Sequence, residues 1–211
     1  MAADHGRACF CSRTHCERSA HALEARSSIG AWPCGLTPAR LKGLAITMLP
    51  DLLVPGLKLV VCGSAAGAVS AARGEYYAGP GNKFWPTLHQ VGLTARRLAP
   101  HEYRELLSYG IGLTDVAKDQ TGNDAAIDFC RSDPASLRSK VHRFSPLFLV
   151  SNGKKAAQVF LGKPLIAFGL QPETVGPTRL FVAPSTSGAA SGFWDIGIWQ
   201  DLAQLVRGAA L

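Results

Sequence analysis

From residue 48 onward, short apolar runs alternate with amphipathic stretches. The apolar runs are four to eight residues long and rich in branched side chains, which predicts buried strands at LKLVVCG (57–63), LFLVSNG (147–153), LIAFG (165–169) and LFVAP (180–184). The amphipathic stretches predict helices at FWPTLHQVG (84–92), HEYRELLSYG (101–110), KKAAQVFLG (154–162) and FWDIGIWQDLAQLVRG (193–208). Strands separated by helices predict a three-layer α/β/α sandwich with a four- or five-stranded, mostly parallel sheet.

Residues 1–47 show no such period and mix turn residues with single hydrophobic residues. We expect a poorly ordered N-terminal extension there, with a short helix possible near Leu23, and a folded domain over residues 48–211. Four cysteines lie in this extension, but their spacing lacks the paired C-x-x-C motifs of zinc sites, so we expect no metal: Cys9, Cys11, Cys16 and Cys34.

Charge and hydropathy limit the partners. The 211 residues carry a formal net charge of +7, which fits either a polyanion partner or a solvated basic surface. No apolar run is long enough to span a bilayer, and the first residues lack the apolar core of a signal peptide. We therefore expect an intracellular protein with no membrane partner.

Small and polar residues follow three of the predicted strands, at Gly63-Ser64, Ser151-Asn152 and residues 184–187. Because ligands of parallel sheets bind at the carboxyl ends of the strands, these positions predict a site. The stretch LVVCGSAAGAVSAARGEYYAGPGNKFW (59–85) does not have the spacing of a dinucleotide fingerprint or a P-loop. Its small residues admit a flat ligand, and Tyr76 and Tyr77 offer a stacking face, unless both are packing residues.

Five segments resemble, in order, signature segments of the uracil-DNA glycosylase superfamily: CGSAAGAVSAARGEYYAGPGNKFW, YGIGLTDVAK, FLVSNGKKAAQVF, AFGLQPETV and VAPSTSGAA. They are most similar to the mismatch-specific thymine/uracil branch, with features of the hypoxanthine-DNA glycosylase branch. The resemblance covers about Met48 to Val206. It implies an enzyme that flips a base out of DNA and hydrolyses its N-glycosidic bond without metal or cofactor.

The resemblance places Ala65 where the mismatch branch has an asparagine that positions the attacking water. A methyl group cannot orient water, so two other residues are candidates for catalysis. Asn82 matches the catalytic asparagine of the hypoxanthine branch, and its amide accepts from water while donating to a backbone carbonyl. Asp115 ends a strand-like segment where relatives have a base-reading asparagine; its carboxylate accepts from a base N–H or acts as general base. The two roles are open to exchange. A turn asparagine and a helix cap are the structural alternatives for these residues.

The remaining site residues also follow from the resemblance. Gly63, Ser64, Ala65, Tyr77 and Asn152 are expected to bind the base, with Tyr77 stacking on it. The loop of Ser185, Thr186, Ser187, Gly188 and Ala189 is expected to hold the phosphates beside the flipped nucleotide. Relatives carry a bulky wedge near the end of this loop. Because Gly188 and Ala189 are small, single-stranded or unpaired DNA is favoured.

These residues lead us to expect a monofunctional, monomeric DNA glycosylase that excises uracil from single- or double-stranded DNA in base excision repair, with hypoxanthine, xanthine and other deaminated bases as further candidate substrates. Ala65 motivates an alternative, a uracil-DNA-binding protein on the same fold with little turnover. An α/β enzyme acting on free nucleosides is the third function class.

Overall fold

In the computed structural model, which describes residues 48–209, five strands form one sheet with the order β2-β1-β3-β5-β4. Strands β1 (Leu59–Ala66), β2 (Ile111–Thr121), β3 (Phe148–Asn152) and β5 (Thr178–Ala183) run parallel, and β4 (Gly169–Val175) pairs antiparallel with β5. The predicted fold class is confirmed. The expected extension, the possible helix near Leu23 and the four cysteines considered for metal lie outside the described residues.

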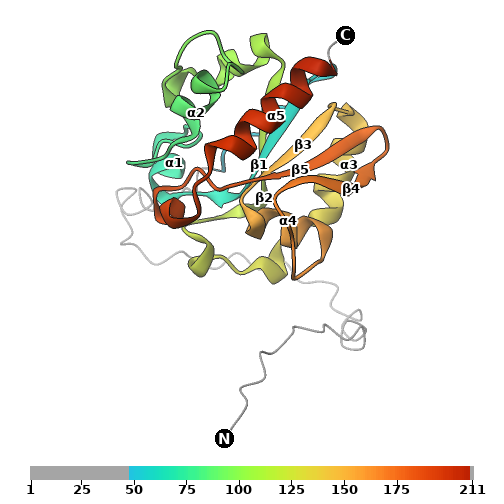
Figure 1. Ribbon diagram of the computed structural model, residues 1–211. Helices are drawn as coiled ribbons and strands as arrows, with labels where there is room; N and C mark the ends of the chain where they lie inside the picture. The colour runs from blue at the N-terminus through green and yellow to red at the C-terminus, as the bar shows by residue number, and fades with distance from the viewer. Residues whose placement is uncertain (1–47, 210–211) are drawn as a thin grey trace, which may run out of the picture. The chain divides into compact units, whose positions relative to one another are not determined.

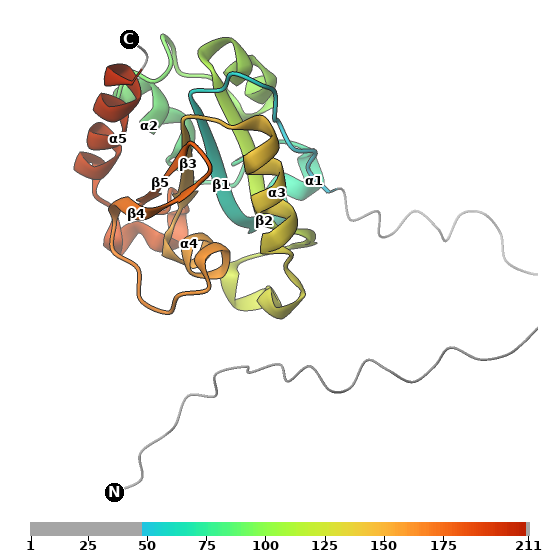
Figure 2. The same ribbon diagram turned by 90° about the vertical axis from the view of Figure 1, so that its right-hand side faces the viewer.

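Helices cover both faces of the sheet (Figures 1 and 2). On one face lie α2 (Phe84–Gln90), α5 (Ile196–Gly208) and the 3-10 helix η2 (Pro100–Tyr109); on the other lie α3 (Pro134–Phe144) and α4 (Lys154–Leu161). The short helices α1 (Ala68–Arg73), η3 (Asp124–Ala126), η4 (Phe129–Arg131) and η5 (Gly188–Phe193) lie in the connections. None of the helices within residues 48–209 is long and apolar enough to cross a bilayer.

The alternating side chains of β1 divide the core between the two faces. Leu59 and Val61 pack with α2, η2 and α5, whereas Val60 and Cys62 pack with α3 and α4. Successive side chains of a strand point to opposite faces, and a central strand covered on both faces is therefore apolar throughout. This explains why the sequence of β1 reads as one continuous apolar run.

Several predicted elements differ from the observed ones. The predicted strand at 165–169 is wrong: Leu165 is 89% exposed after Pro164, and pairing begins only at Gly169. Apolar content misled the prediction because the true edge strand β4 has polar side chains at three of its seven positions, and its half-buried and exposed residues alternate. The C-terminal helix begins at Ile196 rather than at residue 193, since Asp195 caps it by accepting from the Gly197 N–H.

Three further differences concern the small-residue stretch, helix α3 and the strand that carries Asp115. The small-residue stretch after Gly63 is not all loop, because its residues as far as Ala66 belong to β1 and helix α1 follows. Helix α3 was not predicted, although Asp133 and Pro134 form a regular helix start. Asp115 does not end its strand; β2 continues to Thr121. The polar residues after Asp115 conceal this continuation, because they lie near the edge where the sheet is less covered.

Candidate active site

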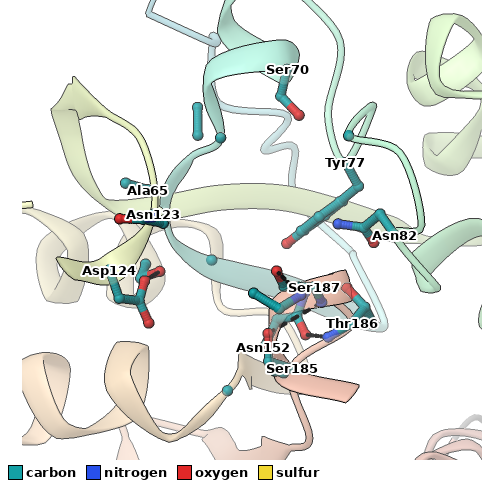
Figure 3. Close-up of a pocket in the computed structure, with 18 of the residues that line it drawn as sticks. Ala65, Ser70, Tyr77, Asn82, Asn123, Asp124, Asn152, Ser185, Thr186 and Ser187 are labelled. Atoms are coloured by element: carbon teal, nitrogen blue, oxygen red, sulfur yellow. Dashed lines mark hydrogen bonds between the residues drawn. The ribbon is translucent and has the colours of Figure 1, made fainter. Parts of the chain in front are cut away.

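A cavity of about 920 Å³ opens at the carboxyl ends of the parallel strands (Figure 3). Its size falls in the range of small-molecule sites. Every residue that the sequence placed in the site lines this one cavity: Gly63, Ser64, Ala65, Tyr77, Asn82, Asp115, Asn152, Ser185, Thr186, Ser187, Gly188 and Ala189. The sheet topology therefore brings together residues from four separate segments of the chain.

Asp115 lies at the side of β1 where Gly63 leaves room for it. The two residues are partners in the β1–β2 ladder, and a β-carbon at position 63 would lie 2.5 Å from Asp115 Oδ1. The Asp115 side chain is 4% exposed, and its Oδ2 lies 3.6 Å from Lys118 Nζ. Burial raises the pKa of Asp115 and the Asp51 charge adds to this effect, while Lys118 opposes it. The site thus contains a buried carboxylate bordering the cavity.

Tyr77 forms the wall beside this carboxylate. Its φ of 54° lies in the left-handed region, which is unusual for an aromatic residue and requires support from its surroundings. That support includes a stacked contact with Phe84, with ring centroids 4.0 Å apart. The Tyr77 hydroxyl is buried without a hydrogen-bond partner. Burial, followed by the Asp115 charge, raises the pKa of Tyr77, so the hydroxyl stays neutral and available as a donor.

Asn82 points into the cavity near Tyr77 (Figure 3). Its side-chain oxygen accepts a hydrogen bond of 3.0 Å from the Phe84 backbone N–H, at the start of α2. This differs from the predicted bond to a backbone carbonyl, because the first N–H groups of a helix need acceptors. The bond nevertheless fixes the direction of the amide. A second lone pair on the oxygen and the NH₂ group remain available to a ligand.

Asn152 is committed to a partner within the protein. Its Nδ2 donates to Thr186 Oγ1 at 2.9 Å, and its Oδ1 accepts from the Thr186 backbone N–H at 2.9 Å. Both side chains are buried. The predicted phosphate-binding loop is therefore anchored to the end of β3 by a two-point contact, and the Thr186 hydroxyl does not face solvent.

The rest of that loop is more open. Ser185 and Ser187 are half-buried, whereas Gly188 and Ala189 are exposed. A backbone bond of 2.8 Å from the Lys83 N–H to the Thr186 carbonyl joins the loop to the segment that carries Asn82. A β-carbon at Gly188 would lie 3.4 Å from the Gly81 carbonyl oxygen, so the two segments approach closely here. The loop and the Tyr77–Asn82 segment therefore form one continuous rim.

Sequence analysis missed Asp124, which lies at the opposite rim of the cavity. Ser64 donates a 2.5 Å hydrogen bond to Asp124 Oδ1, across 60 positions of the chain. Ala65 lies in the same part of the cavity wall, close to Asn123 (Figure 3). The signal in the sequence was weak, because Asp124 sits in the turn TGNDAA, whose polar residues are typical of any loop.

Lysines supply positive charge around the cavity. Lys154 and Lys155 line it, with their ammonium groups over the rings of Phe168 and Phe129. Lys83 donates to Ser191 Oγ at 2.8 Å behind the rim loop. Such cations suit a ligand that carries phosphate groups. Among residues 48–209, no group of three or more His, Cys, Asp or Glu side chains is placed to hold a metal ion.

The chain matches the model of a known family. The model of the family described as "Uracil DNA glycosylase superfamily" matches residues 50–203. The match spans all five strands of the sheet and every residue named above as lining the cavity.

Proposed function

This chain belongs to the uracil DNA glycosylase superfamily, and on that premise we propose that it is a monofunctional glycosylase that hydrolyses the N-glycosidic bond of uracil in DNA. The observation that carries the proposal is the buried Asp115 carboxylate, which borders the cavity of about 920 Å³ beside the buried hydroxyl of Tyr77. A carboxylate acceptor at the wall of such a cavity can read a polar N–H edge of a base.

The proposed reaction begins with a flipped nucleotide, since the bond to be broken is not accessible inside a stacked duplex. The free face of the Tyr77 ring stacks on the base, and the Asp115 carboxylate accepts the imide N–H of uracil. Ser185, Ser187 and the backbone of the rim loop contact the flanking phosphates. Lys154 and Lys155 add charge attraction along the backbone.

Bond cleavage leaves an oxocarbenium-like sugar and an anionic base; water then adds its hydroxyl group to the sugar, and the proton that it releases neutralises the base. We assign the orientation of this water to Asn82, because the Phe84 N–H holds the amide in one direction and leaves an acceptor lone pair for a water proton. Ala65 provides space rather than a contact. Asp115 as general base is the exchanged assignment.

Within the superfamily, the proposed placement is nearest to the mismatch-specific thymine/uracil branch, with hypoxanthine-branch features. Ala65 departs from the first branch, and Asn82 follows the second. An acceptor at Asp115 suits the imide N–H of uracil and the ring N–H of hypoxanthine equally, so hypoxanthine and xanthine are proposed as further substrates. A role in base excision repair follows from such an activity.

A DNA-binding protein with little turnover is the second candidate. It is favoured by Ala65 and by Asn152, because the first has no polar group and the second makes two hydrogen bonds to Thr186. This candidate predicts tight binding of uracil-containing DNA with no excision.

The test is incubation with end-labelled oligonucleotides that carry one uracil, hypoxanthine, xanthine or thymine, each single-stranded, paired and mismatched, followed by alkaline scission. Strand cleavage at uracil is expected, with the single strand or mismatch preferred. Binding without cleavage at any base would replace the enzyme with the binding protein. Hydrolysis of free deoxyuridine would favour the third function class, and Asp115→Ala is the control for a contaminating activity.

A further inference from the structure

Behind Asp115 lies a cluster of charged side chains that the proposed chemistry does not use directly. Lys118 Nζ lies 2.8 Å from Asp51 Oδ1, 2.9 Å from the Tyr76 hydroxyl and 3.6 Å from Asp115 Oδ2. Lys140 contacts Asp51 Oδ2 at 2.7 Å. Two carboxylates and two ammonium groups therefore alternate in the order Lys140, Asp51, Lys118, Asp115.

The position of the Lys118 ammonium is set by its two short contacts. Asp51 is itself held by Thr114, whose hydroxyl donates to it at 2.7 Å. Tyr76 is 1% exposed, and its hydroxyl also contacts the Pro50 carbonyl at 3.2 Å. Because both partners are fixed, Lys118 has little freedom to move closer to Asp115.

A local irregularity in β2 brings Lys118 to this position. The β1–β2 register runs regularly from Gly63–Asp115 to Ala65–Ala117 and then shifts, so that Ala66 pairs with Thr121. Residues 118–120 are therefore extra on β2. Bulges of this kind redirect side chains, and they are frequent beside active sites.

A cation can act on a carboxylate by hydrogen bonding or by charge attraction, and the distances here distinguish the two. At 3.6 Å, Lys118 is too far from Asp115 for a normal hydrogen bond, yet close enough for strong charge attraction. Its N–H groups are directed to Asp51 and Tyr76 instead. Asp115 thus keeps free lone pairs on the cavity side, although a fully buried carboxylate without a cation would tend to be protonated.

We propose that Lys118 is a positioning residue for the base-reading carboxylate: fixed by Asp51 and Tyr76, its ammonium keeps Asp115 ionised without occupying it as an acceptor. This inference deepens the proposed function and rests on it. Asp51 opposes this effect of Lys118, because it draws the ammonium group away from Asp115 and adds a second negative charge.

Of the other groups around Asp115, Asp51 titrates at lower pH than Asp115, and the thiol and the two phenol groups titrate in the alkaline range. Cys62 lies on β1, and Tyr76 and Tyr77 lie on the segment between α1 and α2; burial is the main cause that raises the pKa of each above its usual alkaline value. Burial alone would raise the pKa of Asp51, but Lys118, Lys140 and Thr114 lower it. The acidic limb of activity therefore reports on Asp115.

The test measures single-turnover excision of uracil from a single strand between pH 4 and 9 for the full chain and four variants. Lys118→Met should move the acidic limb to higher pH by about one to two units, since it removes the nearest cation. Asp51→Asn should move the limb to lower pH, and Lys118→Arg should stay near the parent. Lys163→Met removes a lysine that pairs with Glu173 outside the cavity and should change nothing.

Opposite shifts in Lys118→Met and Asp51→Asn are the decisive result, because simple damage to the fold would not change sign between them. Shifts in the same direction, or lower rates with an unmoved limb, would overturn the proposal. Titration of ¹³C-labelled aspartate in the DNA-free protein, with Asp115→Asn identifying the signal, measures the same shifts without any substrate. If the titration shifts as expected but no base is excised, the proposed function fails and the electrostatic relationship stands.

Discussion

Gly63 and Asp115 face each other across the first two strands of the sheet, and the carboxylate occupies the space that a side chain at position 63 would fill. A β-carbon there would lie 2.5 Å from Asp115 Oδ1, closer than real contacts allow, and 3.5 Å from the Tyr77 hydroxyl oxygen. The glycine is therefore required by the close approach of Asp115 to β1.

Gly63→Ala should displace the Asp115 carboxylate and lower the excision rate by about 10²-fold or more, because small misplacements of a reacting group are costly. Single-turnover kinetics on a uracil-containing single strand measures this loss. Gly208→Ala is the matched control, since a β-carbon there meets nothing within 4 Å. An unchanged rate in Gly63→Ala would mean that Asp115 need not hold its observed position.

Asp115→Asn should lower activity by about 10²–10⁴-fold and also raise stability at neutral and alkaline pH. The pKa of Asp115 is raised above its ordinary value of 3.8, chiefly by burial, so the folded state binds this proton more tightly than the unfolded state. Protonated Asp115 therefore contributes fully to the free energy of unfolding at pH values below its ordinary pKa. This contribution is lost as the pH rises through the pKa that Asp115 has in the folded protein.

Thermal unfolding of parent and Asp115→Asn at several pH values tests this sign. The advantage of the variant should grow from pH 4 to pH 8. An advantage that shrinks over this range would show that the ionised carboxylate stabilises the fold through Lys118.

Asn82→Ala should lower both excision and stability, because Asn82 accepts from the Phe84 N–H as well as facing the cavity. Loss of such a hydrogen bond costs about 1 kcal/mol, and loss of a water-orienting group about 10²–10⁴ in rate. Asn82→Asp retains the acceptor for the helix and should restore the melting temperature. If Asn82→Ala excises at the parent rate while melting lower, Asn82 is a capping residue only.

Asn152→Ala, which removes both hydrogen bonds between the rim loop and β3, and Thr186→Val, which removes the bond to the hydroxyl, should each weaken DNA binding. Since the two residues share their hydrogen bonds, their effects on affinity should not add in the double variant. Fluorescence anisotropy with an abasic or uracil-containing strand measures the affinities. Additive losses, or a loss of rate with unchanged affinity, would indicate that Asn152 acts directly on the base.

DNA affinity should fall steeply with salt, with a log–log slope of about −0.7 for each phosphate contact on single strands. Lys154→Ala and Lys155→Ala should each make that slope less steep by the amount expected for about one phosphate contact, because both lysines line the cavity. Titrations at 50–300 mM salt test the expectation, and Lys163→Ala serves as the control. A slope near zero for the parent would argue against phosphate contacts at this rim.

The apolar runs at β1, β3 and β5 and the amphipathic stretches at α2, α4 and α5 determined the fold class from sequence alone. Burial on both faces or on one face imposes a periodicity that is local in the chain. The edge strand β4 was not predicted, because an edge strand need not be apolar. Leu165 led to a strand being predicted in the wrong place, because a single exposed hydrophobic residue carries no structural requirement. The resemblance of the sequence to family segments placed Gly63, Tyr77, Asn82 and Asp115 in one site, and all four residues line one cavity.

Only the tertiary structure decided what each of these residues contacts. The Asn152–Thr186 pair joins positions 34 apart, the Ser64–Asp124 pair joins positions 60 apart, and the Asp51–Lys118 contact depends on a register shift in β2. Such contacts follow from strand register and bulges, which set side-chain directions but leave no periodic trace in the sequence. Residue types at strand ends therefore predicted where the cavity lies, whereas the contacts among its residues depend on packing between distant segments.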